Sequence, residues 1–263
     1  MDPISEKVIY FEDRLKNGEN KILGLPNPTG IGLSILRTDI GYKGKTSGET
    51  AFLLLSGDAV FSFTNKDTTK EISMKRDSLF DENPVTVLLP HDTEYEISPA
   101  DFTEFVILKT ESLNLDKPSI YLSNDVIVEK RGAGILDNTC FRLVKTVFDY
   151  NINPRSSMVL GEVVNFQGRW SSYPPHHHPQ PEIYLYRFDP VEGYGFSQLG
   201  SNVVKVTNNS LVIIDSNRDH PQVSAPGYRM WYLWVVRHLD SNPYTGFEFD
   251  PKHKWIIEKE WRE

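Results

Sequence analysis

Short runs of apolar and β-branched residues, separated by turn residues, follow one another along most of the chain and limit the possible folds more than any other feature. Residues 58–63 are the clearest example, because Ala59, Phe61 and Phe63 occupy every second position, as on the buried face of an antiparallel strand. Gly57-Asp58, where this run begins, is predicted to form a hairpin turn. The sequence has no long amphipathic helical pattern. It predicts an all-β protein, built as a sandwich or a barrel.

The series of strand-like runs is interrupted between residues 110 and 135, where turn-forming sequences such as Asp116-Lys117-Pro118 cluster. Strand-like runs occupy residues 31–108 before this break and residues 141–236 after it. We therefore expect two barrels in tandem, an N-terminal barrel over residues 1–115 and a C-terminal barrel over residues 116–263. A chain of 263 residues is long enough for two such domains.

Three of the seven histidines stand together at residues 176–178, shortly before a strand-like run that begins at Glu182. Because alternate residues of an extended chain share a face, His176 and His178 can point to one side and His177 to the other. A further histidine, His220, follows the apolar run at residues 211–214. Imidazoles combined with a carboxylate suit a catalytic divalent metal. The spacing predicts a metal site of His176, His178, Glu182 and His220, with His177 at its edge.

The first half of the chain contains a weaker version of the same arrangement. Glu49 precedes an apolar strand-like run, and His91 follows a later one, at a separation similar to that between Glu182 and His220. No pair of histidines precedes Glu49. We therefore expect that the N-terminal barrel has a decayed metal site and that the C-terminal barrel has the active one.

The composition excludes several classes of partner. The net charge of −8 and the pI near 5.4 argue against nucleic acid or an anionic membrane surface. No apolar run approaches the ~18 residues of a transmembrane helix, and the N-terminus has no apolar core of a secretion signal. The single cysteine, Cys140, is typical of a reducing cytoplasm. Exposed strand edges are compatible with a homo-oligomer of unspecified size.

These motifs resemble a known family. The His-x-His pair, the later Glu and the distant His resemble the cupin metal motif, and the chain is similar to the 5-deoxy-glucuronate isomerase family of inositol breakdown, which is related to 4-deoxy-threo-hexosulose-uronate ketol-isomerase. The run Trp-Ser-Ser-Tyr-Pro-Pro-His at residues 170–176 is its most specific part. The other matching stretches are residues 161–165, 182–188, 224–228 and 250–255. Two features depart from the pattern: His220 lacks a preceding Pro-x-Gly, and the link at residues 179–181 is short.

The resemblance implies a bicupin, that is, two double-stranded β-helix (jelly-roll) barrels in tandem. It also implies a metal-dependent aldose–ketose isomerase that converts 5-deoxy-D-glucuronate to 5-dehydro-2-deoxy-D-gluconate in myo-inositol catabolism. The expected metal is Zn²⁺, with Mn²⁺ or Fe²⁺ as alternatives. A metal there would act as a Lewis acid on the oxygens where charge develops, in a proton-transfer or a hydride-shift route.

Strand parity assigns further residues of the C-terminal barrel. If Glu182 faces the interior, Tyr184 and Tyr186 share its face and Arg187 points away. An arginine offers a two-pronged donor for the carboxylate of an acidic sugar, and Arg229 follows a predicted ligand. We expect Glu182, Tyr184 and Tyr232 to be catalytic. The expected substrate-binding residues are Tyr184, Tyr186, Gln198 and Arg229.

Other functions fit the same residues. Histidines and a carboxylate also suit a non-haem iron dioxygenase, and a non-catalytic sugar-binding cupin would share the fold. Taken alone, the histidine run is compatible with a surface turn, and the tyrosines that follow Glu182 are compatible with a purely structural role in the hydrophobic core. Oxygen uptake separates the dioxygenase from the isomerase, and sugar binding without turnover identifies the binding protein.

Overall fold

The computed structural model describes residues 7–66 and 68–259, and these residues form two compact units. The N-terminal unit comprises residues 13–126 and 152–157, and the C-terminal unit comprises the other described residues. The units therefore change at residue 126, whereas the sequence pattern suggests residue 115. Residues 7–12 belong to the C-terminal unit, because β1 (Val8–Tyr10) pairs as an edge strand with β19 (Ser210–Ile214).

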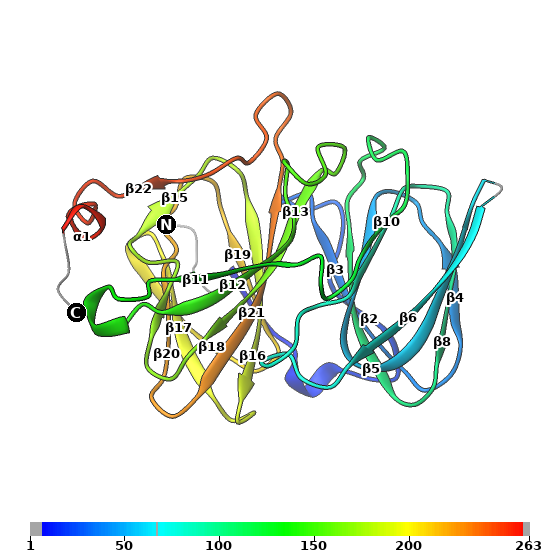
Figure 1. The fold of residues 1–263 in the computed structure, drawn as a ribbon, viewed down its shortest axis with the longest axis horizontal. Coiled ribbons are helices and arrows are strands. Elements are labelled where there is room, and N and C mark those ends of the chain that lie inside the picture. The colour runs from blue at the N-terminus through cyan, green and yellow to red at the C-terminus, as the bar shows by residue number, and fades with distance from the viewer. Residues whose placement is uncertain (1–6, 67, 260–263) are drawn as a thin grey trace. The chain divides into compact units, whose positions relative to one another are not determined.

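The N-terminal unit is a nine-stranded antiparallel sheet preceded by the 3₁₀ turn η2 (Glu12–Arg14). Its strands are β2 (Gly18–Leu23), β3 (Gly32–Thr38), β4 (Tyr42–Lys45), β5 (Thr50–Asn65), β6 (Thr68–Arg76), β7 (Thr86–Leu89), β8 (Glu94–Pro99), β9 (Thr103–Lys109) and β10 (Ser119–Tyr121). The long strand β5 pairs with β7 and β9 along its first part and with β6 and β8 along its second (Figure 1). Aromatic rings fill the interior: the ring centroids of Phe52 lie 5.0 Å from Phe61 and 4.6 Å from Tyr95.

The C-terminal unit contains a seven-stranded sheet in the order β1-β19-β16-β21-β13-β12-β11, a four-stranded sheet in the order β14-β20-β17-β18, and the pair β15-β22. Its other elements are β11 (Ile127–Arg131), η3 (Leu136–Asn138), β12 (Arg142–Phe148), β13 (Met158–Asn165), β14 (Trp170–Ser171), β15 (His176–His177), β16 (Glu182–Asp189), β17 (Tyr194–Leu199), β18 (Asn202–Thr207), β20 (Gln222–Ser224), β21 (Arg229–Arg237), β22 (Glu248–Phe249) and α1 (Trp255–Glu258). Val163 of the larger sheet and Val206 of the smaller one belong to the same core cluster, so the two sheets pack face to face.

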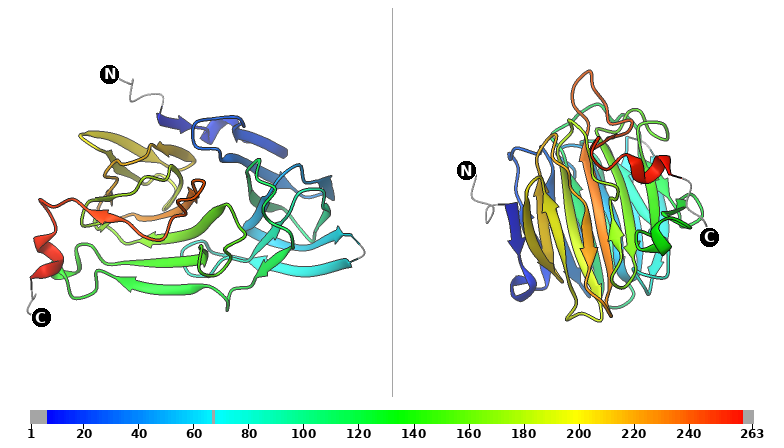
Figure 2. Two further views of the ribbon diagram at one scale, coloured as in Figure 1. Left: turned by 90° about the horizontal axis from the view of Figure 1, so that it is seen from above. Right: turned by 90° about the vertical axis from the view of Figure 1, so that its left-hand side faces the viewer.

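The prediction of an all-β fold is confirmed. Among the described residues the helical elements are α1 and the two short 3₁₀ turns, and none of them is long and apolar enough to cross a membrane. Figure 2 shows the strands from two further directions.

Strand β16 lies in the middle of the seven-stranded sheet, between β19 and β21. Its alternation follows the predicted parity, since Tyr184 and Tyr186 belong to the core cluster between the sheets and Glu182 is buried at its start. Glu182 pairs with Ile214 of β19 and Val236 of β21. The register therefore holds the carboxylate at one end of the sheet. The loop before β16 ends there, and the loop after β19 begins there.

The segment after β21 returns to the histidine run. There β22 pairs with β15, with His176 opposite Phe249, and α1, drawn in red in Figures 1 and 2, follows. At the start of this segment the Nδ1 atom of His238 accepts a hydrogen bond of 2.9 Å from the backbone N–H of Tyr244. His238 must be neutral at Nδ1 to accept it.

We predict a stability loss in acid that depends on His238. Burial, helped by Arg237, lowers the pKa of His238 to about 4. In the unfolded chain the pKa is about 6.5, so between these values the unfolded chain takes up a proton that the folded chain does not, and stability falls as the pH drops through this window. From about pH 7.5 to about pH 4.5, urea unfolding of the wild type should lose ~1–2 kcal/mol more than that of His238→Asn, whose amide oxygen keeps an acceptor without titrating. Parallel pH profiles of the two proteins would contradict this assignment.

A second prediction concerns the contact between β13 and β21. Gly161 lies opposite Trp234, and a Cβ atom at Gly161 would stand 2.5 Å from the indole ring. Gly161→Ala must therefore displace the ring and should lower the free energy of unfolding by about 1–3 kcal/mol. At the control position, Gly41, a Cβ atom would meet its nearest neighbour at 3.9 Å, so Gly41→Ala should leave denaturant stability almost unchanged. Equal stability of the two variants would show that the Trp234 ring adapts freely.

Candidate metal centre

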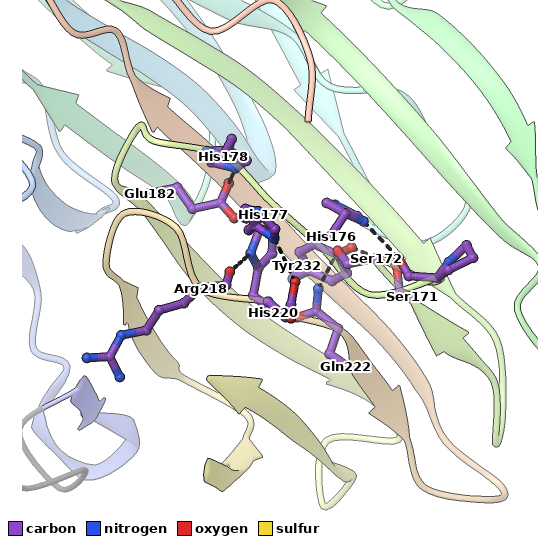
Figure 3. A network of polar contacts seen from close by, with 12 residues as sticks. Ser171, Ser172, His176, His177, His178, Glu182, Arg218, His220, Gln222 and Tyr232 are labelled. Atoms are coloured by element: carbon purple, nitrogen blue, oxygen red, sulfur yellow. Dashed lines mark hydrogen bonds and ion pairs between the residues drawn. The ribbon is translucent and has the colours of Figure 1, made fainter. Parts of the chain in front are cut away.

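Three buried side chains of metal-ligand type converge in the C-terminal unit: His178, Glu182 and His220. One ligand atom from each lies within 4.8 Å of the others. The Nε2 atom of His220 is 3.0 Å from Oε1 of Glu182, and Nε2 of His178 is 3.7 Å from Oε2. Figure 3 shows the Glu182 carboxylate between the two imidazoles. Each of the three side chains is at most 3% exposed, so their charges are poorly screened by water.

Backbone carbonyls orient two of the histidine rings. Nδ1 of His220 lies 2.7 Å from the carbonyl oxygen of Arg218, and Nδ1 of His176 lies 3.0 Å from that of Pro174. An imidazole whose Nδ1–H donates to a carbonyl has an unprotonated Nε2, the form that binds a metal. The backbone N–H of Asn217 donates to the carbonyl of His178 at 2.7 Å, which links the loop after β19 to the loop before β16.

His176 lies beside the three-residue group without being part of it. Its ring centroid is 5.0 Å from that of His220, and both side chains line the same cavity. The ring of Phe247 stacks on His176 at a centroid distance of 4.0 Å, and Tyr244 contacts the edge of His178 at 4.8 Å. The C-terminal segment therefore covers the histidines with aromatic rings, which exclude water from that side.

The donor set fits a divalent cation. Nδ1 of His178 and Oε1 of Glu182 are buried and have no hydrogen-bond partner among the described residues. Buried polar atoms normally have partners, and an ion is one explanation for those that lack one. Imidazole nitrogens with one carboxylate suit Zn²⁺, Fe²⁺ or Mn²⁺. The group could therefore hold a metal, and His176 is close enough to the group to be considered with it.

The electrostatics of the group favour the forms that bind a cation. Burial lowers the pKa of His176 to about 3, and burial also lowers the pKa of His220. Burial acts to raise the pKa of Glu182, but His220 and His178 outweigh it and the pKa is lowered. At neutral pH His176 and His220 are therefore neutral and the carboxylate is ionised.

Two of the predicted tyrosines line the same cavity. The ring of Tyr184 lies 5.9 Å from that of His220 and 4.9 Å from that of Tyr232, and the Tyr232 hydroxyl lies 2.7 Å from Oγ of Ser171. Burial raises the pKa of both phenols, and the charge of Glu182 adds to the effect. Both are therefore neutral hydrogen-bond donors at neutral pH.

Three other expected residues lie away from the cavity lining. Tyr186 is buried in the core, with its hydroxyl hydrogen-bonded to Gln222, and Gln198 donates to the carbonyl of Gly200. Arg229 binds Asp189 at 2.6 and 3.0 Å. Asp189 ends the strand that Glu182 begins, so Arg229 stands roughly 23 Å along β16 from the carboxylate, and it is not among the residues that line the cavity.

The cavity also brings in residues that the sequence analysis missed. They are Arg131, Arg142, Val144, Val163, Ser172, Trp234, Tyr244 and Phe247. Val144 carries a detectable signal in the alternation of β12, whereas Arg142, a charged residue at the start of that strand, carries none. Tyr244 and Phe247 carry none, since they belong to a segment without strand periodicity.

Glu49 and His91, the residues expected to form a decayed metal site in the N-terminal unit, have different environments. Glu49 is buried, and its carboxylate accepts hydrogen bonds from the Ser156 hydroxyl at 2.5 Å and the Ser157 backbone N–H at 2.9 Å. His91 is exposed. Within the described residues, the metal-type group is that of His178, Glu182 and His220.

Known proteins resemble this chain over most of its length. A curated protein of Geobacillus kaustophilus (strain HTA426), named 5-deoxy-glucuronate isomerase, is 26% identical over 226 residues, which cover 80% of this chain and 78% of that protein. An IolB-like protein from Salmonella typhimurium LT2 has a structure that matches with a TM-score of 0.80 at 20% identity, covering 95% of this chain and 99% of that one. A cupin 2 conserved barrel domain protein from Leptotrichia buccalis matches with a TM-score of 0.51 at 14% identity, covering 88% of this chain and 96% of that one.

These findings confirm the predicted cupin fold and the resemblance stated from the motifs, and they point to an enzyme of the isomerase class. The model of the KduI/IolB family matches residues 29–256, which include strands of both units and the whole histidine and glutamate group. The chain therefore belongs to the KduI/IolB family.

Proposed function

We propose that the chain is a 5-deoxy-glucuronate isomerase, which converts 5-deoxy-D-glucuronate to 5-dehydro-2-deoxy-D-gluconate in myo-inositol catabolism. The observation that carries the proposal is the buried group of His178, Glu182 and His220, in one cavity with Tyr184 and Tyr232. The curated relative from Geobacillus kaustophilus bears the same name. A cytoplasmic location and a homo-oligomer remain predictions, as does the decayed site around Glu49.

In this proposal His176, His178, Glu182 and His220 hold a divalent cation, with Zn²⁺ preferred and Mn²⁺ or Fe²⁺ as alternatives. A cation bound there supplies Lewis-acid polarisation of the substrate oxygens. The neutral state of His176 and His220 leaves their Nε2 lone pairs free for it, and the ionised Glu182 contributes the negative charge.

The reaction moves the carbonyl from C1 to C2, while one hydrogen passes from C2 to C1 and another from O2 to O1. Glu182, Tyr184 and Tyr232 are the groups proposed to touch the reacting atoms. The two neutral phenols donate hydrogen bonds to the oxygens on which negative charge develops, and their buried environment strengthens those bonds. Phe247 and Tyr244 exclude water from the histidine side of the cavity.

Metal content tests the ligand set. Elemental analysis of purified protein should find about one Zn²⁺ per chain in the wild type, and His178→Ala, Glu182→Gln and His220→Ala should each weaken metal binding by at least ~10-fold. His177→Ala is the matched control, because His177 points to Asp219, at 3.0 Å, and lies outside the group. Undiminished metal in the three variants, or an equal loss in the control, would refute the assignment.

Turnover tests the reaction. The metal-loaded wild type should convert 5-deoxy-D-glucuronate to the ketose without oxygen uptake, as followed by NMR and an oxygen electrode. Tyr232→Phe should lower kcat by ~10²-fold with its metal retained, since it removes a donor to the charged oxygen. Tyr228→Phe should turn over normally, because Tyr228 is not among the residues that line the cavity.

Two results would count against the isomerase. Oxygen consumption coupled to substrate loss would identify a dioxygenase instead. Binding of the sugar acid with no ketose formed, in protein that contains its metal, would identify a binding protein.

A further inference from the structure

Arg142 is the least expected residue of the cavity. It is the first residue of β12 and shares the inward face of that strand with Val144, which packs in the core cluster. Both side chains line the cavity that contains Glu182. Arg142 is only 7% exposed, so it is a buried arginine inside the barrel. Arginines are almost never buried without a partner.

The guanidinium of Arg142 has no anionic partner among the described residues. It donates to the carbonyl of Cys140 at 2.8 Å, and no described carboxylate lies within 4.0 Å of it. Burial lowers the pKa of Arg142, but a guanidinium remains charged at neutral pH. An unpaired buried charge is strongly destabilising, and folded proteins compensate such a charge with an ion of opposite sign.

A second arginine increases the positive charge at the same place. Arg131 of β11 stands directly opposite Arg142 in the strand pair, so the two side chains share a face, and Arg131 also lines the cavity. Like charges directly opposite each other disfavour strand pairing. Arg131 is 41% exposed and is bound to Glu129 at 2.7 Å, whereas Arg142 is buried. Among the residues that line this cavity, Glu182 is the carboxylate, and it lies with the histidines.

We propose that Arg142 binds the carboxylate of the sugar-acid substrate, with Arg131 adding positive charge at the outer side. This inference rests on the proposed function and names the residue that makes the site select an acid. Arginine presents two parallel N–H donors that match the two oxygens of a carboxylate. Arg142 takes the role that the sequence analysis gave to Arg229, whose guanidinium is already bound to Asp189.

The order of groups along the cavity suits a sugar acid with an aldehyde at one end and a carboxylate at the other. Tyr184 contacts His220 and Tyr232, and the charge of Arg142 acts on the Tyr232 hydroxyl. The tyrosines therefore stand between the metal-type group and the guanidinium. With its carboxylate at Arg142, the substrate presents its aldehyde end to Glu182 and the histidines, and Arg142 acts as an orienting and specificity residue.

The test compares an acid with its amide. The probes are 5-deoxy-D-glucuronate, its uronamide, and the reduced forms of both, in which the aldehyde is an alcohol and cannot isomerise. In metal-loaded Arg142→Gln, the reduced acid should bind ~100-fold more weakly than in the wild type, whereas the reduced amide should change by less than ~3-fold. KM for the acid should rise in parallel. Arg142→Lys should recover part of the loss, because it keeps the charge without the two-pronged geometry.

Matched controls separate this role from a structural one. Arg169→Gln removes another arginine of the same unit, one that packs over Phe141 and Phe166 outside the cavity, and should leave acid binding unchanged. Equal weakening of acid and amide in Arg142→Gln, or failure of the wild type to bind the reduced acid, overturns the inference. A third outcome separates the two proposals. If the reduced acid binds in a way that depends on Arg142 but the wild type shows no turnover, the proposed isomerase is overturned while the inference stands.

Discussion

The C-terminal unit depends on the burial of one ionised carboxylate. Glu182 begins the central strand of the larger sheet and is 2% exposed, so its charge must be balanced inside the protein. His178 and His220 stand on either side of it and lower its pKa against the effect of burial. The loops that carry these histidines leave the sheet at the strand end where Glu182 lies. The register of β16 and the positions of these two loops therefore both serve to surround the Glu182 carboxylate with imidazoles.

The two units use related strand arrangements to build different interiors. In the N-terminal unit, Phe52, Phe61 and Tyr95 pack ring against ring and occupy the space between the strands. In the C-terminal unit, Tyr184 and Tyr232 lie in comparable contact with each other but reach polar groups, and a cavity lies beside them. The phenols of the C-terminal unit can donate hydrogen bonds to a ligand in the cavity, whereas the phenyl rings of Phe52 and Phe61 can only pack.

The sequence predicted features that depend on local periodicity. Alternation in residues 182–186 gave the direction of Glu182, Tyr184 and Tyr186, because a strand between two neighbours keeps its parity. Parity could not give depth: Tyr186 shares the face of Tyr184 but lies in the core, with its hydroxyl on Gln222. Arg229 lies away from the cavity for a related reason, since closeness in sequence to a predicted ligand says nothing about which end of a strand a residue occupies.

Contacts between distant segments could not be predicted from the sequence. Tyr244 and Phe247 reach the histidines because β22 returns to β15, a pairing set by tertiary packing with no periodic pattern around it. Arg142 was missed because a charged residue at the start of a strand usually faces water. Its burial is visible only when its neighbours are known. Sequence reasoning thus identified the group that could hold a metal, but not the far end of the cavity.

The pairing of β1 with β19 sets the order in which this protein can assemble as it is synthesised. The strands of the N-terminal unit, from β2 to β10, pair only with one another, so their hydrogen-bonded ladder can close while later segments are still being translated. Val8 emerges before all of them yet pairs with Val212. Strand β1 therefore cannot form its native pairing until β19 has been synthesised, and its edge is available to other chains until then. During that interval the unpaired strand can pair wrongly with a neighbouring chain.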